Sequence, residues 1–303
     1  MKAIITLLTV IFSLIILAGC KNIDYKKTPG GMPYKLYESK SGKKIFNNYY
    51  LKVNVTRTIE DSVLYTTKDK LPTYVYVNPN PIPYDVSELW TSMKQGDSVL
   101  TIQLIDTFMQ HSPGNIPPQF KKGERIMTYI KILDVFETDS AMSADEAMER
   151  KKWSEHEVAD MLKYLENKNI KAQKTPNGAF VEIINPGEGN LIDTGNYVSL
   201  KYKGISFSGV TFDSNIDPGF GHTDPLNFIV GRKGMIAGLD EAIRFLRKGA
   251  IAKIYIPSML AYGANPGTDK IKPFENIMFE VTIIDVKDKA PVMEIPQKPG
   301  VKK

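Results

Sequence analysis

Few side chains of this chain could do chemistry. Its 303 residues include one Cys and three His, which excludes an internal disulfide framework and a Cys-based zinc site and argues against a His-rich metal site. Asp213 and Tyr262 stand out among the other polar residues, because both follow or lie in loop-like segments beside Gly. A carboxylate and a phenol in such segments can orient neighbours through hydrogen bonds. We find no phosphate-binding loop, and we expect no metal and no cofactor.

Three further polar residues lie between these two candidates. His222 is isolated in a loop, and we expect it at the surface. Asp217 and Asp224 flank it at a spacing too loose to predict a metal site.

The composition is that of a globular protein with room for two or three domains. Hydrophobic residues make up 42% of the chain and charged residues 24%, which excludes disorder throughout. A mean hydropathy of -0.22 excludes a polytopic membrane protein. The formal charge of +5 is modest and Lys and Arg are spread along the sequence, so we expect no nucleic-acid partner.

The first residues have the pattern of a secretory signal. The apolar run from Ala3 to Ala18 is shorter than the about 20 residues of a membrane-spanning helix. It ends in Leu17-Ala18-Gly19-Cys20, which resembles the lipobox of bacterial lipoproteins. The resemblance implies that residues 1–19 are removed and that acyl chains such as palmitate on Cys20 anchor the protein in the bacterial cell envelope, the outer membrane being favoured. The alternative is a short membrane anchor with an incidental Cys.

Beyond the signal, the chain divides into two strand-rich stretches. We expect a tether over 20–41, where Pro29-Gly30-Gly31 interrupts any regular pattern. Apolar and polar residues alternate in segments of 42–138 and again in 173–288. The second stretch also predicts a short helix near 239–246, so the fold class is α+β, with a helix packed on an antiparallel sheet.

A long helix is expected between the two stretches. Residues 143–169 contain no Gly or Pro, and Ser143 begins a capping-box spacing. We interpret 139–172 as a helical linker, with or without a break near Trp153. The last residues, 289–303, predict a flexible tail.

The two strand-rich stretches also echo each other. Residues 123–135 match 274–286 at six of thirteen positions, and Met93-Lys94-Gln95-Gly96 aligns with Leu246-Arg247-Lys248-Gly249. The offsets are 151 and 153, so one small insertion accounts for the difference. We therefore favour a duplicated domain with a divergent first copy over two unrelated strand ends.

Several segments of the second stretch resemble, in order, the FKBP family of peptidyl-prolyl cis-trans isomerases. No single segment is diagnostic of the family, but the occurrence of so many in the same order over roughly residues 175–286 strongly indicates the resemblance. The resemblance implies an antiparallel half-barrel sheet wrapped on a short helix, and it implies that proline-containing unfolded or folding polypeptides are the partners. The segments are Pro186-Gly187-Glu188-Gly189, Leu200 to Gly204, Gly209 to Ser214, Pro225 to Gly231, Met235 to Leu239, Lys253 to Pro257, Leu260 to Gly263, Ile271, Pro273 and Phe279-Glu280-Val281.

The chemistry of such an isomerase explains an apolar site. Rotation about an Xaa-Pro bond crosses a barrier of about 18–20 kcal/mol that comes from amide resonance. No bond is broken, so a catalyst needs only to bind the twisted amide better than either planar form. A twisted amide has less charge separation, and an apolar, water-poor cleft therefore favours it.

The resemblance assigns roles to particular residues. Tyr262 would donate a hydrogen bond to a peptide carbonyl, Asp213 would orient the cleft through Tyr hydroxyls, and the backbone N–H of Ile236 would contact the ligand. Taken alone, each of the apolar residues is more often a core residue. The candidate catalytic residues are Tyr202, Phe212, Asp213, Tyr262 and Phe279, and the candidate substrate-binding residues are Leu226, Phe228, Met235, Ile236, Leu239 and Ile271.

Two departures from the family pattern bear on the cleft. Leu239 lies where many eukaryotic members have Trp, and Leu226 replaces a common Phe. Both changes keep an apolar wall and remove aromatic area, so we expect activity to survive and bulky macrolide inhibitors to bind less well. The segment 213–225 is somewhat long, which alters the rim.

The first stretch lacks the polar residues of the second. The counterparts of Asp213 and Tyr262 fall near Val63-Leu64-Tyr65 and Thr107-Phe108-Met109. Such an FKBP-like domain could bind unfolded chains, mediate dimerisation or hold the other domain away from the membrane. For the whole chain we favour an isomerase that folds envelope proteins. The alternatives are a chaperone or scaffold that binds proline-containing segments without turnover, and a purely structural lipoprotein; the oligomeric state stays open.

Overall fold

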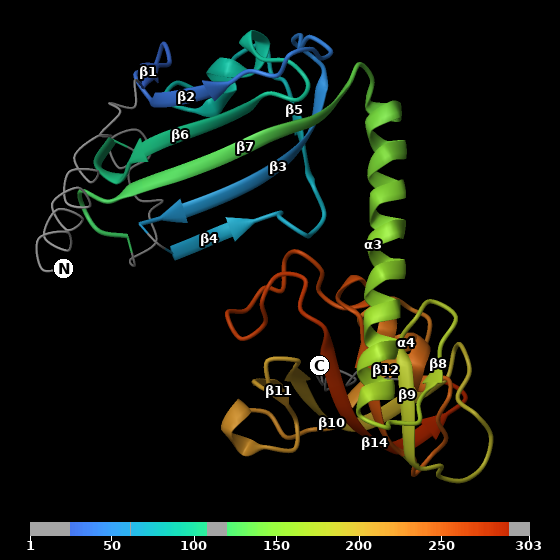
Figure 1. The fold of residues 1–303 in the computed structure, drawn as a ribbon. Helices are drawn as coiled ribbons and strands as arrows, with labels where there is room; N and C mark the ends of the chain where they lie inside the picture. Colours follow the sequence, from blue (N-terminus) through green and yellow to red (C-terminus); the bar gives the residue numbers. More distant parts are fainter. Residues whose placement is uncertain (1–24, 61, 108–119, 291–303) are drawn as a thin grey trace, which may run out of the picture. The chain divides into compact units, whose positions relative to one another are not determined.

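The computed structural model describes residues 25–60, 62–107 and 120–290. The chain forms two compact units, and the boundary between them falls between Glu149 and Arg150. This boundary lies within α3, Asp139–Asn167, which is one unbroken helix (Figure 1). No helix among the described residues is long and apolar enough to cross a membrane.

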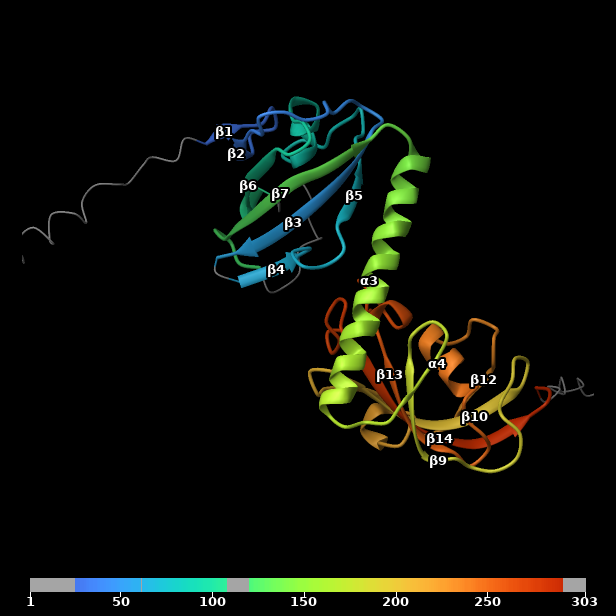
Figure 2. The same cartoon turned by 45° about the vertical axis from the view of Figure 1, so that its right-hand side comes forward.

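The first unit is built on an antiparallel sheet. Among the described residues the sheet has seven strands in the order β1-β2-β6-β7-β3-β4, and β5 pairs with β3 beside β4 (Figure 2). The 3-10 helix η1 packs Leu89 and Trp90 into its core. The elements are β1 Lys26–Lys27, β2 Pro33–Tyr37, β3 Tyr50–Ile59, β4 Ser62–Thr66, β5 Thr73–Tyr76, η1 Val86–Ser92, β6 Ser98–Leu104 and β7 Arg125–Phe136.

The expected tether is wrong where the structure describes it. Tyr34 pairs with Thr101 of β6, and Met32 is fully buried, so this segment belongs to the first sheet. Pro29-Gly30-Gly31 forms the turn of a hairpin: the N–H of Gly31 donates to the carbonyl of Thr28 at 2.8 Å, and Gly31 has a φ of 89° that suits glycine. Pro and Gly are typical of both turns and flexible spacers, so the sequence alone does not distinguish this hairpin turn from a tether.

The other terminal predictions lie outside the described residues. These are the signal peptide, Cys20 and almost all of the tail expected at 289–303.

The second unit is also built on an antiparallel sheet with the same arrangement of strands. Its sheet has the order β11-β10-β14-β13-β9-β8, and β12 pairs with β10 beside β11. The helix expected near 239–246 is present as α4. The elements are β8 Gln173–Lys174, β9 Phe180–Asn185, β10 Tyr197–Ser206, β11 Thr211–Ser214, η2 Pro218–Phe220, β12 Leu226–Ile229, α4 Ala237–Ile243, β13 Ile251–Ile256, η3 Ser258–Leu260 and β14 Ile277–Lys287.

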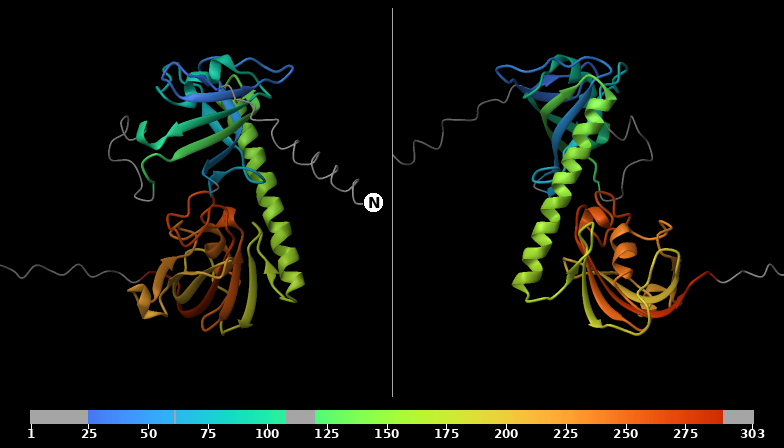
Figure 3. Two further views of the ribbon diagram at one scale, coloured as in Figure 1. Left: turned by 60° about the vertical axis from the view of Figure 1, so that its left-hand side comes forward. Right: turned by 90° about the vertical axis from the view of Figure 1, so that its right-hand side faces the viewer.

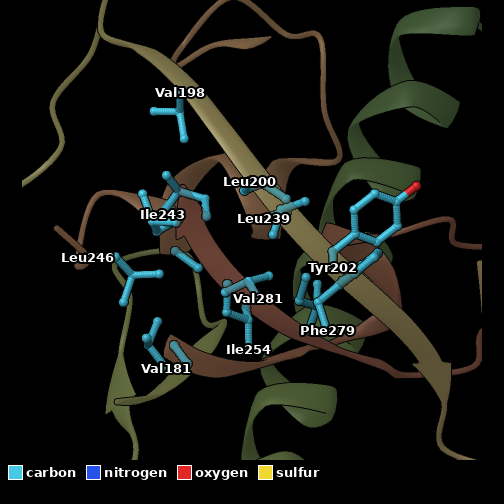
Figure 4. Close-up of a cluster of buried hydrophobic side chains, with 14 of the residues drawn as sticks. Val181, Val198, Leu200, Tyr202, Leu239, Ile243, Leu246, Ile254, Phe279 and Val281 are labelled. Carbon is cyan, nitrogen blue, oxygen red and sulfur yellow. The ribbon is translucent and has the colours of Figure 1, made fainter. Parts of the chain in front are cut away.

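Both faces of the second sheet are covered. On one face Leu239 and Ile243 of α4 pack against strand residues that include Leu200 and Val281 (Figure 4). This contact requires Gly238, because a Cβ there would lie 2.3 Å from Cγ2 of Ile256. On the other face the C-terminal part of α3 lies along the sheet (Figure 3), where it buries its own apolar stripe. That stripe and its partners are Met161, Leu165, Phe180 and Tyr255.

The two sheets share one topology, which supports the duplication inferred from the sequence echo. In each sheet the long last strand lies between the third and sixth strands of its unit. Irregularities in pairing recur at matching places: between Lys52 and Val53 of β3 against β7, and between Ser199 and Leu200 of β10 against β14. Equal strand order and equal bulge positions are specific features of a backbone, and both are expected when one domain is a copy of the other.

Candidate active site

The second unit has a cleft of about 440 Å³ between its sheet and the start of α4. A volume of this size is within the usual range for small-ligand and peptide sites, about 300–1,000 Å³. The cleft gathers eight of the residues that the sequence nominated, together with Lys233 and Gly234. The eight are Tyr202, Asp213, Leu226, Met235, Ile236, Leu239, Tyr262 and Phe279.

An aromatic cluster forms the wall of the cleft. Phe212 meets Phe279 edge to face with ring centroids 5.6 Å apart, and it meets Tyr262 in the same way at 6.0 Å. Gly204 makes room for the cluster, because a Cβ there would lie 2.5 Å from Cζ of Phe212 and 2.9 Å from Cε1 of Phe279. Tyr202 completes the wall at 5.8 Å from Phe279.

Three of the nominated residues do not line the cleft. Phe228 and Ile271 are 7% and 3% exposed and belong to the core cluster of the second unit. Phe212 is 9% exposed and supports the wall through its ring contacts. The structure therefore places these three behind the surface that a ligand would touch.

Asp213 is held by three hydrogen-bonding groups at the edge of the cleft. Its Oδ2 accepts from the hydroxyl of Tyr202 at 2.6 Å. Its Oδ1 accepts from the backbone N–H of Ser214 at 2.8 Å and lies 2.9 Å from Nε2 of His222. Burial, then the hydrogen bond to Asp213, raises the pKa of Tyr202 above its ordinary value. The phenol thus stays protonated and keeps donating to the carboxylate at neutral pH.

His222 differs from its sequence-based expectation. Its side chain is 47% exposed, as expected for a surface loop, but it faces the cleft carboxylate instead of standing alone. The loop that contains η2 places His222 beside Asp213 of β11. A contact between residues on different elements leaves no local pattern in the sequence, so it could not be predicted. Asp217 of the same loop accepts from the N–H of Gly219 and caps η2, so it serves the loop.

Two hydrogen-bond donors at the cleft have no protein partner. The hydroxyl of Tyr262 and the backbone N–H of Ile236 form no hydrogen bond with any part of the chain that the structure describes. Burial, followed by the charge of Asp213, raises the pKa of Tyr262, so its phenol also remains a donor. A cleft with mainly apolar walls and two free donors can bind a peptide, because the donors can hydrogen-bond to its carbonyl oxygens while the walls exclude water.

Comparison with known proteins agrees with this geometry. The family of the FKBP-type peptidyl-prolyl cis-trans isomerase matches residues 189–284. The chain is 36% identical over 124 residues to the peptidyl-prolyl cis-trans isomerase Mip of Coxiella burnetii, covering 41% of this chain and 51% of that protein. It is 32% identical over 110 residues to FK506-binding protein 1 of Dictyostelium discoideum, covering 36% of this chain and 99% of that protein.

A third relative is the FKBP-type 22 kDa peptidyl-prolyl cis-trans isomerase of Escherichia coli. The identity is 32% over 131 residues, which cover 43% of this chain and 61% of that protein. The chain thus matches 51% of the length of the Coxiella burnetii protein and 61% of the length of this Escherichia coli protein. It belongs to the family of FKBP-type peptidyl-prolyl cis-trans isomerases.

Proposed function

We propose that the second unit catalyses cis-trans isomerisation of Xaa-Pro bonds in polypeptides. The observation that carries the proposal is the pair of free donors, the Tyr262 hydroxyl and the Ile236 N–H, at a cleft whose walls are mainly apolar. A planar amide is polar along its C–N bond, and a twisted amide is less so. Apolar walls such as Phe279 and Leu239 therefore stabilise the twisted form relative to either planar form, which lowers the barrier.

Each polar group has a role that needs no proton transfer. The Tyr262 hydroxyl holds the substrate carbonyl, and the Ile236 N–H fixes the neighbouring peptide unit. Asp213 orients Tyr202 through the 2.6 Å hydrogen bond and thereby fixes one side of the wall. Because nothing is transferred, the protein's contribution is orientation and exclusion of water.

The substrates that we propose are unfolded or folding proteins of the bacterial envelope. The support is the apolar run ending in Leu17-Ala18-Gly19-Cys20, with the only Cys of the chain at its end. Acyl chains on Cys20 contribute about 0.8 kcal/mol per buried methylene, so more than one chain gives stable anchoring. Mass spectrometry of the wild-type protein and of Cys20→Ser tests this step: the variant should be released from the membrane, and a wild-type protein without acyl groups would refute it.

The isomerase proposal is tested by exchange kinetics of a short Ala-Leu-Pro-Phe peptide with the full chain. Tyr262→Phe removes one hydrogen bond with a net value of about 0.5–1.5 kcal/mol, so kcat/KM should fall few-fold to about tenfold. Phe279→Ala removes a wall, and the loss should be larger in protein shown to be folded. Peptide binding without any exchange would instead favour a chaperone or scaffold, and would contradict the proposal.

A further inference from the structure

The first unit contains a cavity of about 550 Å³ at the place that corresponds to the candidate active site. The strand registers establish the correspondence. Arg57 of β3 lies opposite Tyr65 of β4, directly before a bulge, and Gly204 of β10 lies opposite Asp213 of β11, also directly before a bulge. Tyr65 lines the first cavity and Asp213 lines the second. The two units therefore each have a cavity at corresponding strand positions, as well as the same strand order.

The walls of this cavity are apolar and its rim is exposed. Val53, Trp90 and Ile130 line it from the core and are 1%, 3% and 5% exposed. At the rim, Tyr76 and Ile82 line the same cavity while 46% and 66% exposed. Large apolar side chains that line a hollow and stay in contact with water are typical of binding surfaces.

The features that suit a twisted amide are missing. Tyr65 stands in the position of Asp213, and Thr128 in the position of Phe279, because Thr128 lies opposite Arg57 as Phe279 lies opposite Gly204. Without the large ring, there is room for a long side chain where the second unit tolerates only glycine. The Nε of Arg57 donates to Oγ1 of Thr128 at 3.4 Å.

The guanidinium changes the charge of the cavity. Arg57 is exposed and makes no ion pair with any described residue. Asp85 also lines the cavity but makes no ion pair with Arg57; its carboxylate caps η1 and accepts from the N–H of Ser87 at 2.8 Å. The second cleft has a carboxylate, Asp213, at the corresponding edge. A ligand of the first cavity should therefore contribute a negative charge near Arg57.

We propose that this cavity is a second polypeptide site, which holds an extended segment with an apolar side chain next to an Asp or Glu and does not isomerise it. The apolar side chain enters between Val53 and Trp90, and the acidic group pairs with Arg57. Tyr76 and Ile82 flank the segment at the rim. The proposal does not depend on catalysis by the second unit, since every residue in it belongs to the first.

Trp90 supplies a direct reporter. The chain has two Trp residues, Trp90 and Trp153, so the full chain with Trp153→Phe reports on the cavity alone. Three hexapeptides with acetylated and amidated ends are titrated into this variant. Each has a central Leu-Phe, and they differ only in whether Glu, Gln or Lys flanks it. The Glu peptide should change Trp90 emission in a saturable way. It should bind about two- to fivefold more tightly than the Gln peptide, the range for a partly exposed ion pair, and more tightly still than the Lys peptide.

Two variants separate this site from a general effect of charge. Arg57→Ala should abolish the preference for Glu, whereas Arg125→Ala, which removes another exposed Arg of the same sheet, should keep it. Ile82→Ser should weaken all three peptides alike. Equal affinity for the three peptides, no change in Trp90 emission, or Glu preference that survives Arg57→Ala would each overturn the proposal. Binding of a small apolar anion such as anilinonaphthalene sulfonate, with no peptide binding, would also overturn it.

Discussion

The carboxylate of Glu157, on α3, accepts hydrogen bonds from the hydroxyl of Ser258 and, at 3.1 Å, from the backbone N–H of Met259. Ser258 begins η3, and the loop that follows carries Tyr262, the proposed donor to the substrate. Glu157 is only 5% exposed although it lies on a helix rich in charged residues, and Trp153 one turn earlier packs edge to face on Phe274. The helix therefore fixes the base of the loop that closes one side of the cleft.

Glu157→Ala should destabilise the second unit. The change leaves the buried Ser258 hydroxyl and the partly buried Met259 N–H without the carboxylate that accepts from them, which costs about 1–3 kcal/mol. Denaturant unfolding of the full chain measures the loss. Glu155→Ala, which alters an exposed neighbour on the same helix, is the matched control and should leave unfolding within about 0.5 kcal/mol of wild type. Equal unfolding curves for the two variants would contradict the role given to Glu157.

The same carboxylate gives a pH dependence of known sign. Burial raises the pKa of Glu157 above its ordinary 4.5, despite the lowering effect of the hydrogen bonds from Ser258 and Met259. The folded state then holds the proton more tightly than the unfolded state, so this group favours folding most at pH below 4.5. Its contribution declines as pH rises through the folded pKa. The difference in unfolding free energy between wild type and Glu157→Gln should therefore decrease as the pH is raised above 4.5. An increase over this range would contradict the direction given for the pKa shift of Glu157.

Gly204→Ala tests the aromatic wall. The added Cβ would lie 2.5 Å from the ring of Phe212 and 2.9 Å from that of Phe279, so the wall must shift. Overpacking of this kind costs about 1–3 kcal/mol, and the displaced rings should lower kcat/KM more than unfolding at the assay temperature explains. Gly234→Ala, whose Cβ would meet no atom within 4 Å, should leave the unfolding free energy almost unchanged. If Gly204→Ala had the same kcat/KM as wild type, the aromatic wall would not be part of the active site.

Asp213 and His222 should contribute unequally to catalysis. The contact between them joins side chains that are 41% and 47% exposed, so His222→Ala should lower kcat/KM by at most about fivefold. Asp213→Ala also removes the charge-assisted hydrogen bond from the Tyr202 hydroxyl, which is worth about 1.5–3 kcal/mol. Asp213→Ala should therefore lower kcat/KM more than His222→Ala does. His156→Ala removes a His–Asp contact of 3.3 Å on α3 and is the control. A larger loss from His222→Ala than from Asp213→Ala would reverse these roles.

Sequence reasoning succeeded where a pattern is local. The alternation within β10 and β14 predicted strands, and the resemblance to the family implied the half-barrel and most of the residues that line the cleft. The echo between residues 123–135 and 274–286 predicted a duplication that strand order and bulge positions support. The strands and the echo depend on periodicity and spacing, which a single chain displays directly.

Contacts between distant segments were not predicted. The Glu157–Met259 hydrogen bond joins residues 102 positions apart, and Glu157 is one carboxylate among many on a charged helix. Its signal was position: it lies four residues before Met161, on the stripe that also contains Leu165 and is buried against the sheet. His222 and the hairpin at Pro29-Gly30-Gly31 were missed for a similar reason, because loop residues acquire partners only when the fold is formed.

The C-terminal part of α3 should be required by the second unit. Met161 and Leu165 cover Phe180 and Tyr255, which are 1% and 3% exposed. A fragment that starts at residue 173 would expose these side chains, each worth about 1.5–3 kcal/mol of burial. A fragment of residues 150–290 should therefore unfold cooperatively and retain peptide exchange, whereas 173–290 should be several kcal/mol less stable or unfolded. Limited proteolysis of the full chain provides the second measurement: the stable fragment should begin before Glu157, and a fragment that begins near Thr175 with undiminished stability would show that the helix is only a linker.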